Sequence, residues 1–122
     1  MPKRYGLFEA DWKGLKAEIR QNLVDLARSR QVVTYSELTR QLRTAQLHPH
    51  SYTLAGLLRE ICHEEADAGR GLLCALVVTQ QTGLPGGGFF RIAARRGRDI
   101  ADPEQCWANE VQMIYDQWAN GS

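Results

Sequence analysis

The chain has 122 residues, of which 43% are hydrophobic and 24% charged, and this balance is typical of one globular domain rather than of a disordered segment. No apolar run approaches the roughly 18 residues that a membrane-spanning helix needs, and no apolar core follows the basic first residues as in a secretory signal. An integral membrane protein and a secreted precursor are therefore not expected, and three cysteines without paired spacing favour a reduced, cytoplasmic protein free of disulfides.

The net charge of +1 hides an uneven distribution along the chain. Residues 72–98 contain four arginines and no acidic residue, whereas residues 99–122 contain five acidic residues and no lysine or arginine. Two kinds of partner suit the basic segment. One is the phosphate backbone of a nucleic acid, and the other is the acidic segment itself, within one chain or across a dimer.

Residues 1–10 are interpreted as a lead-in arm, and a helix is expected over residues 11–30. Apolar side chains recur in this second segment at spacings of three and four, which places them on one helical face. That face comprises Trp12, Leu15, Ile19, Leu23 and Leu26.

Two further helices begin at recognisable caps. Thr34 and Glu37 have the spacing of a capping box, in which each side chain accepts a hydrogen bond from the other residue's backbone N–H. This predicts a helix over residues 35–43. Ser51 is a suitable N-cap for a third helix over residues 51–67, and the preceding His48 and His50 are interpreted as parts of a polar turn rather than metal ligands. The third helix is expected to bury Leu54, Leu57, Leu58, Ile61 and Cys62.

Two apolar runs flank a loop rich in glycine and proline, and this arrangement predicts a β-hairpin with strands near 72–80 and 88–94. The first run carries no charge, so both of its faces are expected to be buried. No helix is expected to begin at the glycines of residues 86–88, which favours a turn over a phosphate-binding loop. The return strand leads into Arg95, Arg96 and Arg98, and the hairpin thus resembles a basic wing. Replacing these three arginines with alanine is expected to leave the melting temperature nearly unchanged.

The last helix is expected over residues 103–119, with residues 120–122 as a frayed end. Asp102 is a suitable N-cap, and Pro103 fits the first helical position because proline has no N–H to satisfy there. The apolar stripe of this helix is expected to pack on the first helix, or across a two-fold axis in a homodimer or against another protein. The stripe comprises Trp107, Val111, Ile114 and Trp118.

The order of elements predicts an α+β fold, namely a single winged helix-turn-helix domain over residues 1–122 with an N-terminal helix, one β-hairpin wing and an extra C-terminal helix. In such folds the N-terminal end of the recognition helix reads base edges, while basic side chains contact phosphates. The residues assigned to nucleic-acid binding are therefore Tyr35, Ser51, Tyr52, Thr53, Arg59, Arg91, Arg95, Arg96 and Arg98.

Short strings within residues 30–93 resemble the DNA-binding domain of alkyltransferases and alkyltransferase-like proteins. Residues 32–38, VVTYSEL, are similar to that domain's V-x-T-Y-G-E-L/I opening, and residues 54–58 lie where the family has its recognition helix. Residues 72–78 lie where the family has its Pro-Cys-His-Arg-Val-Val active-site segment. Cys74 matches the reactive cysteine, but Leu73 replaces the proline, Ala75 replaces the histidine, and the family's arginine wedge is missing, with Arg59 the nearest candidate. The resemblance implies DNA binding without alkyl transfer, and Cys74 is expected to be buried and unreactive.

The expected function is thus that of a non-catalytic, nucleic-acid-binding protein with double-stranded DNA as its partner and no cofactor. Two alternatives stay open. The first is a protein–protein interaction module, which the acidic residues of the third helix favour because they repel phosphates. These residues are Glu60, Glu64, Glu65 and Asp67. The second is a non-catalytic, alkyltransferase-like sensor of modified bases, which requires a concave pocket that no sequence feature shows.

Overall fold

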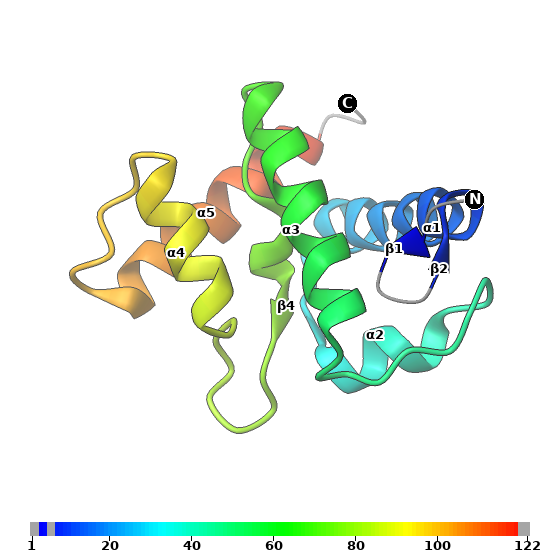
Figure 1. Cartoon of the computed structure of the whole chain (residues 1–122). Coiled ribbons are helices and arrows are strands. Elements are labelled where there is room, and N and C mark those ends of the chain that lie inside the picture. The colour runs from blue at the N-terminus through cyan, green and yellow to red at the C-terminus, as the bar shows by residue number, and fades with distance from the viewer. Residues whose placement is uncertain (1–2, 5–6, 120–122) are drawn as a thin grey trace.

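The computed structural model describes residues 3–4 and 7–119, and helices dominate this part of the chain (Figure 1). The described helices are α1 (Glu9–Arg28), α2 (Tyr35–Gln41), α3 (Tyr52–Asp67), α4 (Gly87–Arg95) and α5 (Pro103–Trp118). A short 3-10 helix, η1 (Leu73–Leu76), lies between α3 and α4. The α+β class is confirmed at this coarse level, because two pairs of very short strands accompany the helices. No described helix has the length and apolar character needed to cross a bilayer.

The four predicted helices are confirmed as α1, α2, α3 and α5, with ends that differ from the predicted ones by at most two residues. Their caps explain this agreement. The Thr34 hydroxyl accepts from the Glu37 N–H at 3.1 Å, and the Glu37 carboxylate accepts from the Thr34 N–H at 3.0 Å, which completes the capping box. Ser51 caps α3 by accepting from the Leu54 N–H at 3.1 Å, and Asp102 caps α5 by accepting from the N–H of Gln105.

The described part of residues 1–10, expected to be a lead-in arm, contains two short strands and the start of α1. Strands β1 (Lys3–Arg4) and β2 (Leu7–Phe8) pair in antiparallel fashion, and α1 already begins at Glu9. At the other end of α1, Arg30 has a φ of 56°, a left-handed conformation that carries the chain out of the helix. Residues 1–2 and 5–6 of the arm, and the expected frayed end at 120–122, lie outside the described residues.

The predicted β-hairpin is wrong. Residues 72–80 form η1 and the two-residue strand β4 (Val77–Val78), and residues 88–94 lie inside α4. In α4 the buried side chains are Phe89, Ile92 and Ala93, which have helical spacing. The apolar run from Phe89 to Ala93 is too short for its period to decide between strand and helix. The expectation that no helix begins at residues 86–88 is also wrong, because α4 begins at Gly87.

Strand β4 instead pairs in parallel with β3 (Val33–Thr34), with Val33 opposite Val77 and Thr34 opposite Val78. Parallel neighbours cannot be joined by a tight turn, so this pair is not a wing. The winged form of the predicted fold is therefore corrected. The pairing places the start of α2 beside the end of β4, and the Tyr35 hydroxyl accepts a hydrogen bond from the Gly86 N–H at 3.1 Å.

The core is centred on η1, which contacts α1, α3 and α5. The uncharged run is buried on all sides, as expected, but helices rather than a sheet enclose it. Helix α5 packs on α1 and η1, which confirms the predicted contact with the first helix and covers most of its stripe within the chain. The side chains of Val111, Ile114 and Trp118 are buried, and Trp107 is half-buried.

Candidate nucleic-acid interface

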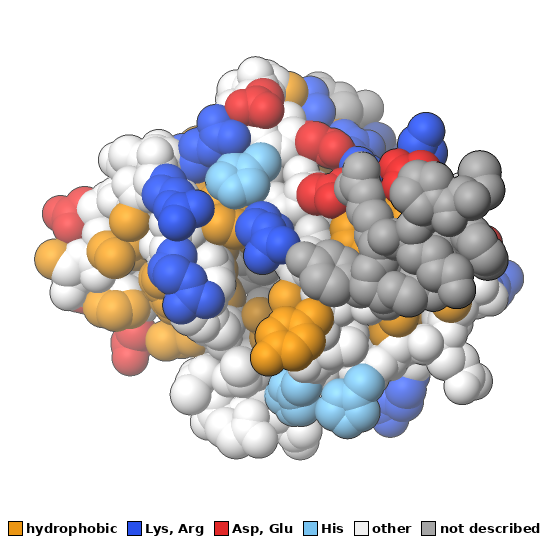
Figure 2. Space-filling view, in the orientation of Figure 1, with side chains coloured by type: hydrophobic (Ala, Val, Ile, Leu, Met, Phe, Trp, Pro, Cys, Tyr) orange, Lys and Arg blue, Asp and Glu red, His pale blue; other side chains and the backbone are white. Residues whose placement is uncertain are grey.

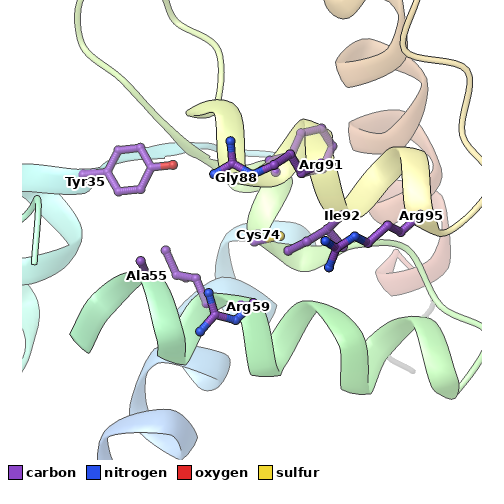
Figure 3. A pocket seen from close by; sticks show the side chains of 10 residues that line it. Tyr35, Ala55, Arg59, Cys74, Gly88, Arg91, Ile92 and Arg95 are labelled. Atoms are coloured by element: carbon purple, nitrogen blue, oxygen red, sulfur yellow. The ribbon is translucent and has the colours of Figure 1, made fainter. Parts of the chain in front are cut away.

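A cavity of about 360 Å³ opens between α3 and α4. Figure 3 shows Ala55 and Arg59 on α3, Arg91 and Arg95 on α4, and Cys74 of η1 between the two helices. Tyr35, at the start of α2, lies at one end. The lining comprises Tyr35, Ala55, Leu58, Arg59, Cys74, Gly88, Phe89, Arg91, Ile92 and Arg95. We call this space the arginine-lined cavity.

The lining combines apolar side chains with three arginines and contains no acidic side chain. Arg91 and Arg95 are four residues apart on α4, so they project from one face of that helix. Both are exposed, and neither has a hydrogen bond or ion pair to another residue in the described part of the chain. Figure 2 shows Lys and Arg side chains gathering over α3 and α4. The cavity is therefore an electropositive recess with an apolar interior.

The acidic residues of α3 do not line this cavity, and each forms an ion pair elsewhere. Lys16 on α1 lies 3.2 Å from the Glu60 carboxylate and 2.6 Å from that of Glu64. Glu65 is 1% exposed and accepts from Arg20 and Arg70, whose positive charges keep the pKa of its carboxyl low despite the burial that raises it. Asp67 pairs with Arg96 at 2.9 Å. The side of α3 that faces the cavity therefore presents no carboxylate to repel a phosphate.

Two of the arginines predicted to contact phosphate are bound by side chains of the same chain. The Arg98 guanidinium donates to both carboxylate oxygens of Glu110, from Nε at 2.8 Å and from Nη2 at 2.9 Å. Arg96 donates from Nη1 to Asp67 and from Nε to Nδ1 of His63 at 3.2 Å. The Arg98–Glu110 pair joins the basic segment to the acidic one within a single chain. The sequence left two kinds of partner open for the basic segment, and Arg98 binds the acidic segment of its own chain. Neither Arg96 nor Arg98 lines the cavity.

The residues predicted around the start of α3 have different surroundings. Ser51 uses its hydroxyl as the helix cap, while Tyr52 is 85% exposed and Thr53 is half-buried. None of these three lines the arginine-lined cavity. Ser51 lines a neighbouring hollow of about 230 Å³ that shares Tyr35 and Ala55 with the cavity, whereas Tyr52 and Thr53 line neither space.

Tyr35 and Cys74 differ in what they offer a ligand. Tyr35 accepts from the Gly86 N–H, so its own hydroxyl proton remains available, and burial raises the pKa of this phenol. Cys74 is 6% exposed, and burial together with the neighbouring Cys62 thiol raises its pKa well above the usual range. The predicted burial of Cys74 is confirmed, and its low reactivity stays a prediction.

The apolar half of the lining was missed by sequence reasoning. Phe89, Ile92 and Gly88 line the cavity only because residues 87–95 form a helix. The helical spacing of Phe89, Ile92 and Ala93, with Arg91 and Arg95 on the remaining face, is a local signal of this arrangement, but the stretch is too short for that signal to exclude a strand. Among the described residues, no group of three or more His, Cys, Asp and Glu side chains is placed to hold a metal ion.

Comparison with known proteins adds no relative: no protein-family model, curated protein or solved structure matches the chain.

Proposed function

We propose that the protein binds nucleic acid, as a non-catalytic binding protein, through the face formed by α3 and α4. The observation that carries the proposal is the arginine-lined cavity, to which three arginines and no acidic side chain contribute. Arginine suits phosphate because its planar fork donates two parallel hydrogen bonds to neighbouring acceptor oxygens. Double-stranded DNA is the partner that the resemblance of residues 30–93 implies.

The hydrogen-bonding character of the lining supports the same partner. Its charged side chains, Arg59, Arg91 and Arg95, are donors only, and the Tyr35 hydroxyl has a proton to donate. The N-terminal turn of α4 adds the positive end of a helix dipole close to the cavity, since Gly88 belongs to both. A ligand rich in acceptor oxygens and negative charge fits this set of groups, and a nucleic-acid backbone is such a ligand.

A second candidate function is that of a non-catalytic sensor of modified bases. The sequence shows no pocket for this role, whereas the structure has a recess with Leu58, Phe89 and Ile92 in its lining. A flat base rotated out of its stack fits an apolar recess of this kind, and the cost of unstacking is least at a damaged or mispaired base. Ala75 in place of the family's histidine and the raised pKa of Cys74 both argue against transfer of a group to the thiol.

The test of the proposal is binding to a labelled duplex over a range of salt concentrations. The double variant Arg91→Ala/Arg95→Ala is expected to lose affinity, and the slope of log K against log salt is expected to fall by about two, because each lost phosphate contact removes about 0.9. Both side chains are exposed, so stability is expected to change by less than about 0.5 kcal/mol per substitution. Fluorescence anisotropy and thermal melting measure the two effects.

The matched control is Lys13→Ala/Arg43→Ala, which removes the same charge from exposed positions outside the cavity. It is expected to keep most of the affinity. Equal losses in the two double variants would show that binding follows net charge alone and would contradict the proposed face.

The sensor function has its own comparison, between an unmodified duplex and one with a single O6-methylguanine. Ala55→Trp fills the cavity from an exposed position on α3 and is expected to abolish any preference for the modified duplex while retaining the salt slope. Equal affinity of the unsubstituted protein for both duplexes would reject the sensor and leave simple nucleic-acid binding.

A further inference from the structure

We propose that Glu110 on α5 is a positioning residue for the arginine-lined cavity, holding η1 and the end of α4 in fixed places from behind. Helix α5 contributes no residue to the lining. Its influence on ligand choice rests on the proposed function, whereas its hold on η1 is a property of the fold and is measurable without any ligand.

The carboxylate of Glu110 joins the two segments directly. It is 2% exposed, and Oε2 accepts from the Leu72 N–H at 2.8 Å. Both of its oxygens also accept from the Arg98 guanidinium. Leu72 immediately precedes η1, which carries Cys74, and Arg98 lies just after α4, which carries Arg91 and Arg95. One buried side chain therefore fixes the start of one wall segment and the end of another.

Two more side chains of α5 hold the same stretch. The Gln117 Oε1 accepts from the Gly71 N–H at 2.7 Å, and the Trp107 indole donates to the Ala75 carbonyl at 2.8 Å. Residues 107, 110 and 117 are spaced by three and seven, so they share one face of α5. The approach is close enough to require glycine at 71, because a Cβ there would lie 2.6 Å from Cγ1 of Ile114. Side chains of α5 thus form hydrogen bonds with the backbone of residues 71–75 at three positions, 71, 72 and 75.

The chemistry of the Glu110 contacts favours a positioning role over a contribution to stability alone. An apolar side chain of similar volume often stabilises a core as well as a buried ion pair does, because removing charges from water is costly. A carboxylate differs in that it orients its donors, and here the donors belong to two separate parts of the cavity wall. Helix α4 lies between two loops, residues 79–86 and 96–102, so the Arg98–Glu110 pair adds an anchor near its end to the packing of its buried face on α3.

The test uses Cys74 as a built-in reporter of the wall. Glu110→Gln keeps the size of the side chain and one acceptor oxygen for the Leu72 N–H. It removes the negative charge, and its NH2 group cannot accept from Nε of Arg98 as Oε1 of Glu110 does. We expect the rate at which a small thiol reagent labels Cys74 to rise about tenfold relative to Cys62, which is fully buried on α3, because opening of the 71–76 segment becomes easier. Mass spectrometry of peptides distinguishes the two thiols.

Asp116→Asn is the matched control, since it removes a carboxylate of the same helix whose pair with Arg30 is mostly exposed. It is expected to leave both labelling rates unchanged. Trp107→Phe, which removes the N–H that donates to the Ala75 carbonyl but keeps an aromatic ring, gives a milder test if the Glu110 variant does not fold. Parallel acceleration of Cys74 and Cys62, or no change at either thiol, would overturn the proposal.

The binding assay separates this inference from the proposed function. Glu110→Gln retains Arg59, Arg91 and Arg95, so its affinity for an unmodified duplex is expected to change by less than about threefold, with the same salt slope. Any preference of the protein for the duplex with a single O6-methylguanine over the unmodified duplex is expected to fall in this variant. Failure of the unsubstituted protein to bind nucleic acid would reject the proposed function while leaving the labelling result for Cys74 intact.

Discussion

Replacing Trp118 with alanine is expected to lower the free energy of unfolding by about 3–5 kcal/mol, the usual cost of deleting a buried aromatic side chain. Trp118 is 6% exposed and lies at the end of α5, the helix that packs on α1 and η1. The guanidinium carbons of Arg20, Arg28 and Arg70 lie 5.7–5.8 Å from its ring centroid, so the indole also supports a cluster of cations. Chemical denaturation with a fluorescence readout from the remaining tryptophans measures the effect.

Trp118→Phe is the matched control for this prediction. The indole N–H has no hydrogen-bond partner in the described structure, so phenylalanine removes no hydrogen bond and keeps most of the ring packing. Its cost is expected to stay below about 1.5 kcal/mol. Size-exclusion chromatography examines the homodimer alternative, because packing within one chain predicts the same elution volume for the parent and both variants. An alanine variant with unchanged stability would show that the end of α5 contributes little to the core.

The second large effect is expected for Arg98→Ala, which should destabilise the protein by about 2–4 kcal/mol because it leaves the Glu110 carboxylate buried without its cation. The value lies slightly below the usual range for a broken buried pair, since the Arg98 side chain is 26% exposed. The measurement is the midpoint and slope of a urea unfolding curve.

Arg95→Ala provides the comparison, because Arg95 is exposed on α4 and lacks an ion pair among the described residues. Its stability is expected to equal that of the parent within about 0.5 kcal/mol. The sequence places Arg95, Arg96 and Arg98 alike in a solvated turn, and the structure corrects that interpretation for Arg96 and Arg98. Equal stabilities of the Arg98 and Arg95 variants would show that the pair with Glu110 contributes nothing to folding.

Local signals predict the helices well because their caps are local. The Thr34–Glu37 box and the Ser51 and Asp102 caps each satisfy backbone donors within three residues, so no distant contact is needed to define these helix starts. The segment from Phe89 to Ala93 has no such marker, since Gly86 caps α4 without a side-chain bond. Its apolar residues fit both a strand and a helix, and only packing against α3 selects the helix.

The candidate site illustrates the same limit. Arg91 and Arg95 were predicted to bind nucleic acid as parts of a wing, and they line the cavity as neighbours on one face of α4. Arg96 caps the end of α4 and Arg98 follows it, and both side chains bind partners of the same chain, a difference that composition cannot express. The cavity joins residues of α2, α3, η1 and α4, so its existence depends on tertiary contacts that no single stretch of sequence shows.

The most direct test of nucleic-acid binding through α3 and α4 is a titration with duplex DNA followed by NMR at the side-chain Nε–Hε signals of the arginines. The signals of Arg91 and Arg95 are expected to move with a common dissociation constant, while those of Arg96 and Arg98 are expected to stay in place because both side chains are bound by partners of the same chain. Movement of the Arg96 and Arg98 signals without those of Arg91 and Arg95, or no movement at saturating DNA, would contradict the proposed interface.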